Sequence, residues 1–231
     1  MVALVLLPGM DGSGSLFSDF TSMFGAETVA IADPPDRPLD YAQLQELVRS
    51  LLPAEKPFIL LAESFSGPIA IALAANPPPQ LKAVVLVCTF ARLPLSALPS
   101  LLKRIAASVP WWRSPVSIVS RVLLGGFATA SSVSALSRAM KVVSPETWKA
   151  RLTAVLSVDE TQSLCRIQLP VLYLRASKDR VVFPGASAVI SGQVPRIKVV
   201  EIDAPHLLLQ ARPRESAAAI KAFAHDHGLA L

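Results

Sequence analysis

Hydrophobic residues in this chain form short runs that alternate with amphipathic or turn-forming segments. Six of the runs are mostly apolar and rich in Val, Ile and Leu, as expected for buried strands. They span residues 2–7, 27–32, 57–62, 81–88, 169–176 and 197–202. Strands that are apolar on both faces pair in parallel sheets that helices cover on each side.

The segments between these strands have helical spacing or turn chemistry. Helices are expected near residues 16–24, 40–52, 65–76 and 214–228, and Asp40 is placed to cap the second of them. The alternation of strand and helix predicts an α/β fold, with a mostly parallel sheet, helices on both faces and right-handed crossovers.

The alternation stops between Phe90 and about Glu160. This segment lacks a strand pattern but contains amphipathic stretches at residues 98–112 and 132–143. We therefore expect an α/β core made of residues 1–90 and 161–231, with residues 91–160 inserted as a helical cap. Ligands of open α/β folds bind beyond the carboxyl ends of the strands, so such a cap would cover the site.

Length and composition agree with one globular domain that carries an insertion. The chain has 231 residues and 52% hydrophobic content, enough to bury a substantial core. Its apolar runs are too short to cross a bilayer, and no basic segment precedes the first of them, so we expect a cytoplasmic protein without a membrane span. Cys88 and Cys165 are far apart and outside any CxxC pattern, and are interpreted as ordinary thiols.

The net charge of +5 is unevenly distributed. Residues 91–160 carry nine Lys and Arg but three Asp and Glu, whereas residues 1–90 carry four and nine. The basic residues are scattered singly among apolar ones and not grouped with stacking aromatics, which argues against nucleic acid binding. A solvated basic face explains them most simply.

A serine lies where the third predicted strand turns into a helix, in "AESFSG" at residues 62–67. Such a turn strains the serine backbone and exposes its hydroxyl above the sheet edge, and Ala62, Ser66 and Gly67 are small enough for the tight fold-back. Ser64 is thus a candidate nucleophile, with a helix-capping serine as the alternative. The Phe65 N–H at the helix start would bind a developing oxyanion.

A serine nucleophile requires a base and a group that orients the base. His206 follows the sixth predicted strand, at the same sheet edge as Ser64, whereas His225 and His227 lie at the end of the last helix. Asp179 follows the fifth predicted strand, which gives the order Ser, Asp, His typical of this architecture. Asp159 and Asp203 are the competing carboxylates. The second oxyanion donor is expected to be the Met10 N–H, in the glycine-rich loop after the first strand.

Four motifs carry a family resemblance across nearly the whole chain: "LPGMDGSG", "AESFSG", "SKDRVV" and "APHLLLQARP". In order and spacing they resemble an α/β-hydrolase-fold serine hydrolase, of the small carboxylesterases that include pimeloyl-carrier-protein methyl ester esterases. Pro8 stands where that family often has a His, Ser66 replaces the second glycine of the turn, and the usual leading antiparallel strands are missing. The loss of the His removes a side chain that often braces the oxyanion loop.

The resemblance implies a carboxylesterase that acts on a small-molecule ester through an acyl-enzyme, without cofactor or metal. Thioesterase or acyltransferase activity on a carrier-bound acyl chain is the alternative, and a non-catalytic ligand-binding protein is a further one. A dinucleotide site is disfavoured, because Gly9, Gly12 and Gly14 read G-x-x-G-x-G and Met10 is bulky.

The expected substrate depends on the cap. Its aliphatic residues together with Trp111, Trp112 and Phe127 would either line an apolar acyl pocket or seat the cap on the core. Its basic excess would suit a carboxylate-bearing substrate or an acidic acyl carrier protein.

Overall fold

The computed structural model describes residues 2–25, 29–31, 35–93, 110 and 113–231. Its centre is one sheet of six parallel strands in the order β2-β1-β3-β4-β5-β6. The strands are β1 (Ala3–Leu7), β2 (Val29–Ile31), β3 (Phe58–Glu63), β4 (Leu81–Val87), β5 (Val171–Ala176) and β6 (Ile197–Ile202). The predicted α/β architecture is confirmed, and every strand of the described sheet is parallel.

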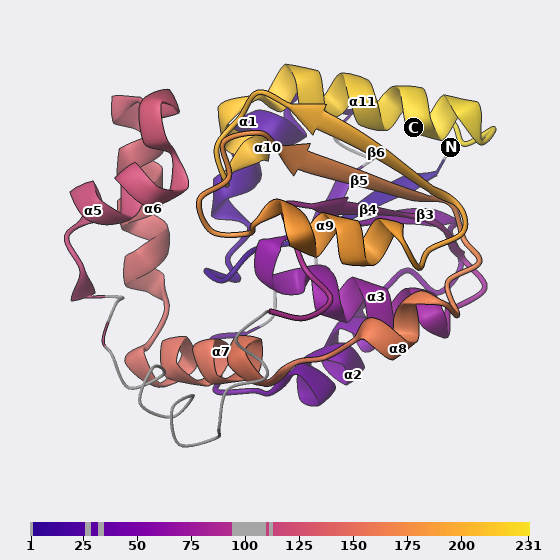
Figure 1. Cartoon of the computed structure of the whole chain (residues 1–231), viewed down its shortest axis with the longest axis horizontal. Helices are drawn as coiled ribbons and strands as arrows, with labels where there is room; N and C mark the ends of the chain where they lie inside the picture. The colour runs from indigo at the N-terminus through magenta and orange to yellow at the C-terminus, as the bar shows by residue number, and fades with distance from the viewer. Residues whose placement is uncertain (1, 26–28, 32–34, 94–109, 111–112) are drawn as a thin grey trace.

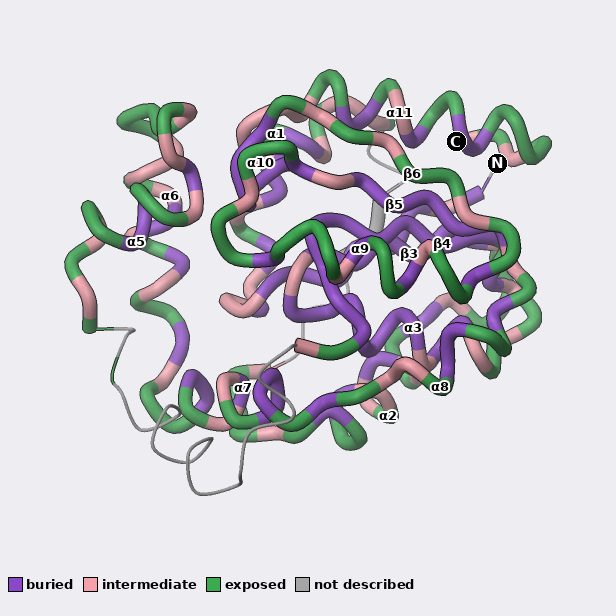
Figure 2. Tube along the Cα trace, viewed as in Figure 1, coloured by how far each residue is buried: buried purple, intermediate pink, exposed green. Residues whose placement is uncertain are grey.

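Two helical layers cover the sheet (Figure 1). One layer consists of α2 (Tyr41–Leu51), α3 (Gly67–Ala75), α8 (Thr161–Leu164) and α9 (Pro184–Ser191). The other consists of α1 (Ser18–Thr21), α10 (Leu208–Ala211) and α11 (Pro213–Asp226). Alternate residues of each central strand point to the two layers, so Val5 and Leu7 join one core cluster while Leu4 and Leu6 join the other. Strands β1, β3, β4 and β5 are accordingly mostly buried in Figure 2, whereas the edge strand β6 is exposed or intermediate.

Local sequence signals account for the long helices. The Asp40 side chain accepts a hydrogen bond from the Gln43 backbone amide, and the Gln43 side-chain oxygen accepts one from the Asp40 backbone amide, which completes a capping box at the start of α2. The expected helix at residues 16–24 is shorter, a 3₁₀ turn at Ser15–Phe17 followed by α1. The short helices α8, α9 and α10 were not predicted, because one to two turns carry little periodicity.

The described part of residues 91–160 is helical. It comprises α5 (Val116–Leu123), a 3₁₀ turn (Gly125–Phe127), α6 (Ala130–Val142) and α7 (Pro145–Ser157). The carboxyl ends of β5 and β6 point toward α5 and α6 in Figure 1. Most of the helix predicted at residues 98–112 lies outside the described residues, as do parts of the second predicted strand. In the described part of the chain, no helix combines the length and the apolar character that a membrane span requires.

A carboxyl group is buried at the end of the central strand β3. Glu63 is 2% exposed, and one of its oxygens accepts a hydrogen bond from the Gln210 amide nitrogen at 3.2 Å. Its other oxygen, Oε1, and the amide oxygen of Gln210 have no donor among the described residues. Burial raises the pKa of Glu63 to about 8 despite the Gln210 hydrogen bond, and nearby Asp11 adds to the increase. Glu63 is therefore mostly protonated at neutral pH, and its acidic proton adds a hydrogen-bond donor beside the buried oxygens of Glu63 and Gln210.

Replacement of this acid should change how stability depends on pH. Between the ordinary glutamate pKa of 4.5 and about 8, the folded protein binds a proton at Glu63 that the unfolded chain has lost. Its stability therefore falls as pH rises through this window. Glu63→Gln cannot titrate, so its unfolding free energy relative to wild type should rise by about 3 kcal/mol from pH 5 to pH 8.

Chemical denaturation at several pH values measures this difference. The control is Glu55→Gln, which makes the same substitution at an exposed carboxyl group. A Glu63→Gln difference that does not vary with pH would contradict a neutral Glu63.

Candidate active site

The turn that follows β3 is tight and strained at one residue. Ser64 has a φ of 50°, in a region that non-glycine residues rarely adopt, and a 3₁₀ turn at Ser64–Ser66 leads directly into α3. The Thr89 hydroxyl donates to the Ser64 carbonyl and lies against Gly67, where an added Cβ would be 1.8 Å from the threonine oxygen. Gly67 is therefore required by close packing and not by its own φ.

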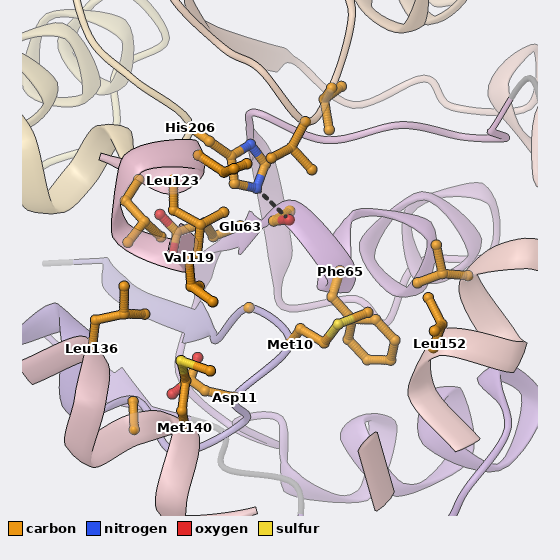
Figure 3. A pocket seen from close by; sticks show the side chains of 18 of the residues that line it. Met10, Asp11, Glu63, Phe65, Val119, Leu123, Leu136, Met140, Leu152 and His206 are labelled. Carbon is orange, nitrogen blue, oxygen red and sulfur yellow. Dashed lines mark hydrogen bonds between the residues drawn. The ribbon is translucent and has the colours of Figure 1, made fainter. Parts of the chain in front are cut away.

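Three residues predicted from separate loops meet above this turn. The Oγ of Ser64 is 2.8 Å from Nε2 of His206 (Figure 3). Nδ1 of His206 is 2.9 and 3.0 Å from the two oxygens of Asp179. An ionised carboxylate can only accept, so Nδ1 carries the imidazole proton and Nε2 is left to accept from the serine hydroxyl. This arrangement can transfer a proton from Ser64 to His206.

The environment of Asp179 keeps it ionised. Burial by itself would raise the pKa of Asp179, but the hydrogen bond and charge interaction with His206 outweigh burial. The backbone amides of Val181 and Val182 also donate to Oδ1 at 2.8 and 2.9 Å. The net result is a pKa below the ordinary aspartate value, so the carboxylate is charged in the folded protein near neutral pH.

The competing candidates lie elsewhere. Asp159 forms an exposed ion pair with Arg92 and accepts from Thr161, and Asp203 pairs with Lys178 on the surface. His227 caps the end of α11 with its ring beside Phe223, and His225 is exposed. No cluster of His, Cys, Asp or Glu among the described residues could hold a metal ion.

The predicted oxyanion residues flank the same space. Met10, in the loop after β1, and Phe65, after Ser64, both line the cavity that also reaches Ser64 and His206. The Ser66 hydroxyl donates to the Pro8 carbonyl and so ties this loop to the turn after β3. The loop itself closes through a hydrogen bond from the Gly12 amide to the Gly9 carbonyl at 3.1 Å, with Gly12 at a φ of 66°.

The cavity above the serine has a volume of about 500 Å³ and is lined mostly by apolar side chains. The strand ends contribute its floor, and α5, α6 and α7 contribute its walls, among them Val119, Leu123, Leu136, Met140, Leu152 and Val155 (Figure 3). Asp11, Glu63 and His206 are the ionisable groups on its described wall, and none of them is Lys or Arg.

From the sequence, Phe127, Trp111 and Trp112 are expected either to line an apolar acyl pocket or to seat the cap on the core. Phe127 does not line the described cavity but lies against the core, with the Arg212 guanidinium 4.7 Å and the Lys178 ammonium 5.3 Å from its ring. It therefore seats the segment on the core and is not part of an acyl pocket. Trp111 and Trp112 lie outside the described residues.

Helix α5 is attached to the loops that carry Asp179 and His206. The Leu207 amide, next to His206, donates to the Leu123 carbonyl at 3.1 Å, and the Arg180 side chain, next to Asp179, donates to the Arg121 carbonyl at 3.1 Å. Sequence reasoning found neither these contacts nor the role of Thr89, because no local pattern distinguishes such residues.

Comparison with known proteins places the fold. The model of the alpha/beta hydrolase family matches residues 2–219. Among solved structures, bromoperoxidase from Bacillus anthracis superposes with a TM-score of 0.82 at 16% identity, covering 97% of this chain and 92% of its own. MenH from S. aureus gives 0.80 at 16% identity, with 98% and 94% covered.

The enol-lactonase from Burkholderia xenovorans LB400 gives a TM-score of 0.79 at 17% identity, with 97% of this chain and 91% of its own covered. No curated protein matches the sequence. At these identities the structural likeness shows a shared fold and not a shared substrate. The family match over nearly the whole length, together with the parallel sheet and the turn after β3, shows that this chain belongs to the alpha/beta hydrolase family.

Proposed function

We propose that the protein is a serine carboxylesterase that hydrolyses esters of uncharged, apolar carboxylic acids through an acyl-enzyme intermediate. The observation that carries this proposal is the chain of contacts from Ser64 through His206 to Asp179, which opens onto an apolar cavity of about 500 Å³. The enol-lactonase among the structural relatives acts on a cyclic ester by its name, which is compatible with this chemistry.

In the proposed mechanism, Oγ of Ser64 attacks the ester carbonyl carbon and its proton passes to Nε2 of His206. The imidazolium, stabilised by Asp179, then protonates the departing alkoxide, and an acyl-serine remains. Water, deprotonated by His206, attacks the acyl-serine and releases the acid. The N–H groups of Met10 and Phe65 bind the oxyanion of each tetrahedral intermediate, and each such donor contributes about 3 kcal/mol.

The polarity of the cavity is the basis for the proposed acyl group. A carboxylate at the far end of a substrate would lose its hydration beside aliphatic side chains, with no cation on the described wall to replace it. Asp179 is also negatively charged nearby, and Asp11 lines the cavity. An uncharged chain instead gains about 0.8 kcal/mol for each buried methylene group.

The first prediction concerns the proposed triad. Ser64→Ala should lower kcat for a p-nitrophenyl ester by about 10⁴-fold or more, and Asp179→Asn should lower it by a similar factor through the wrong imidazole tautomer. The matched control is Asp203→Asn, which removes an exposed carboxylate near the same sheet edge and should retain full activity. Turnover retained in Ser64→Ala would refute Ser64 as the nucleophile.

The second prediction concerns the acyl chain. The kcat/KM for p-nitrophenyl esters should rise by about 10³-fold from acetate to octanoate, since each added methylene is buried in the cavity. A p-nitrophenyl ester with a terminal carboxylate should be at least about 30-fold poorer than its methyl-terminated analogue. Ala139→Leu, which adds bulk to the cavity wall, should lower kcat/KM for octanoate far more than for acetate. Preference for the carboxylate ester would overturn the proposed substrate class.

A thioesterase or acyltransferase that acts on a carrier-bound acyl chain is the second candidate. The observation in its favour is that residues 92–145 contain seven Lys and Arg and no Asp or Glu. A basic segment of this kind would attract an acidic carrier protein, and the attraction would weaken with salt.

Comparison of an octanoyl thioester on an acidic carrier with octanoyl-pantetheine tests this candidate. The carrier should raise kcat/KM at low ionic strength by about tenfold, and the gain should disappear at about 0.5 M salt. Lys141→Glu, which reverses an exposed charge on α6, should reduce the gain without affecting the pantetheine thioester. A carrier gain that is absent, or that is independent of salt, would eliminate this candidate.

A further inference from the structure

A charged side chain from α7 is buried beside the loop that follows β1. Arg151 is 2% exposed, although removing a guanidinium from water is costly unless its donors find partners. None of the ion pairs among the described residues involves it. Burial lowers the pKa of Arg151, while the charges of Asp11 and Asp36 raise it, and an arginine remains protonated at any such value.

The contacts of Arg151 converge on the two residues whose N–H groups would form the oxyanion hole. Nη1 donates to the Met10 carbonyl at 2.7 Å, and the guanidinium carbon lies 6.0 Å from the centroid of the Phe65 ring. It also packs against Gly12 of the same loop, where an added Cβ would be 2.6 Å from Nη2. The loop is therefore shaped around this guanidinium.

The peptide that carries the Met10 N–H lies between two peptides that are held in place. The Ser66 hydroxyl donates to the Pro8 carbonyl, which belongs to the preceding peptide, and Arg151 donates to the Met10 carbonyl, which belongs to the following one. Peptide units are planar, so fixing both neighbours leaves the Gly9–Met10 unit little freedom to rotate. The direction of the Met10 N–H then depends on Ser66 from the core and on Arg151 from α7.

We propose that Arg151 is a positioning residue that aims the Met10 N–H at the oxyanion, so that helix α7 takes part in assembling the catalytic site. This inference rests on the proposed function, because it assigns Met10 as an oxyanion donor. Arg151 does not line the described cavity, so it acts through the loop and does not contact the substrate. It replaces the brace that was expected to be lost with Pro8 at the start of this loop.

The test compares Arg151→Met with Lys149→Met. Both remove one positive charge from α7, but Lys149 is exposed. Arg151→Met should lower kcat for p-nitrophenyl octanoate by about 10- to 100-fold with KM changed less than about threefold, because a misaligned donor weakens transition-state binding and not substrate binding. Lys149→Met should match wild type in both constants.

An inhibitor provides a readout that a merely structural role would not affect. Oγ of Ser64 adds to the carbonyl carbon of an alkyl trifluoromethyl ketone while the serine proton passes to His206. The ketone oxygen of the resulting tetrahedral adduct occupies the oxyanion position. Its Ki in Arg151→Met should rise by the same factor by which kcat/KM falls. Arg151→Lys, which retains a donor, should recover part of both losses.

Gly12→Ala perturbs the same contact through a change in the loop and not on α7. The new Cβ would displace the guanidinium, so kcat should fall while KM changes little, and the effect should shrink when Arg151 is already Met. Gly228→Ala is the matched control, because Gly228 has a similar φ of 68° but open space around its Cβ position. Thermal unfolding of each variant verifies that it is folded.

Three outcomes would overturn the inference: a Ki for the ketone unchanged in Arg151→Met, a rise in KM at constant kcat, or additive effects of Gly12→Ala and Arg151→Met. If Arg151→Met does not fold, Gly12→Ala and Arg151→Lys provide the same measurements, and an unchanged Ki or a rise in KM at constant kcat in both variants would overturn the inference. The proposed function fails separately, since its failure would appear as activity retained in Ser64→Ala.

Discussion

The site depends on one constrained turn, in which the chain leaves β3 and enters α3 within three residues. The positive φ of Ser64 is maintained because the surrounding core holds the turn: Thr89 donates to the Ser64 carbonyl, and Tyr41 donates to the Phe65 carbonyl at 2.8 Å. Gly67 allows Thr89 to approach. The backbone strain at Ser64 is thus supported by hydrogen bonds from residues far away in the sequence, and the hydroxyl is directed out of the sheet.

Two carboxyl groups near this turn have pKa values shifted in opposite directions, although burial by itself raises the pKa of both. Glu63, whose hydrogen-bond partner is a neutral amide, has its pKa raised to about 8, whereas Asp179, which accepts from His206 and two backbone amides, has its pKa lowered. One acid is therefore neutral and the other charged at the same pH. This separation leaves Asp179 as the group that orients the imidazole and limits the negative charge next to Ser64.

The helices of residues 91–160 contact each part of the site. Helix α5 is hydrogen-bonded to the residues next to Asp179 and His206, and α7 reaches the Met10 carbonyl through Arg151. The same helices form the apolar walls of the cavity. A change in their position would therefore alter the shape of the cavity and the alignment of the polar groups together.

Local patterns in the sequence determine the parallel sheet, the helix start at Asp40 and the positions of Ser64, Asp179 and His206, because period, capping and strand order act over short distances or follow from topology. Only the tertiary structure decides the pKa of Glu63, the placement of Phe127 outside the cavity and the contact of Arg151 with Met10. These depend on residues brought together from distant positions, 141 apart for Arg151 and Met10. Burial and packing arise from the whole fold, so no local pattern encodes them.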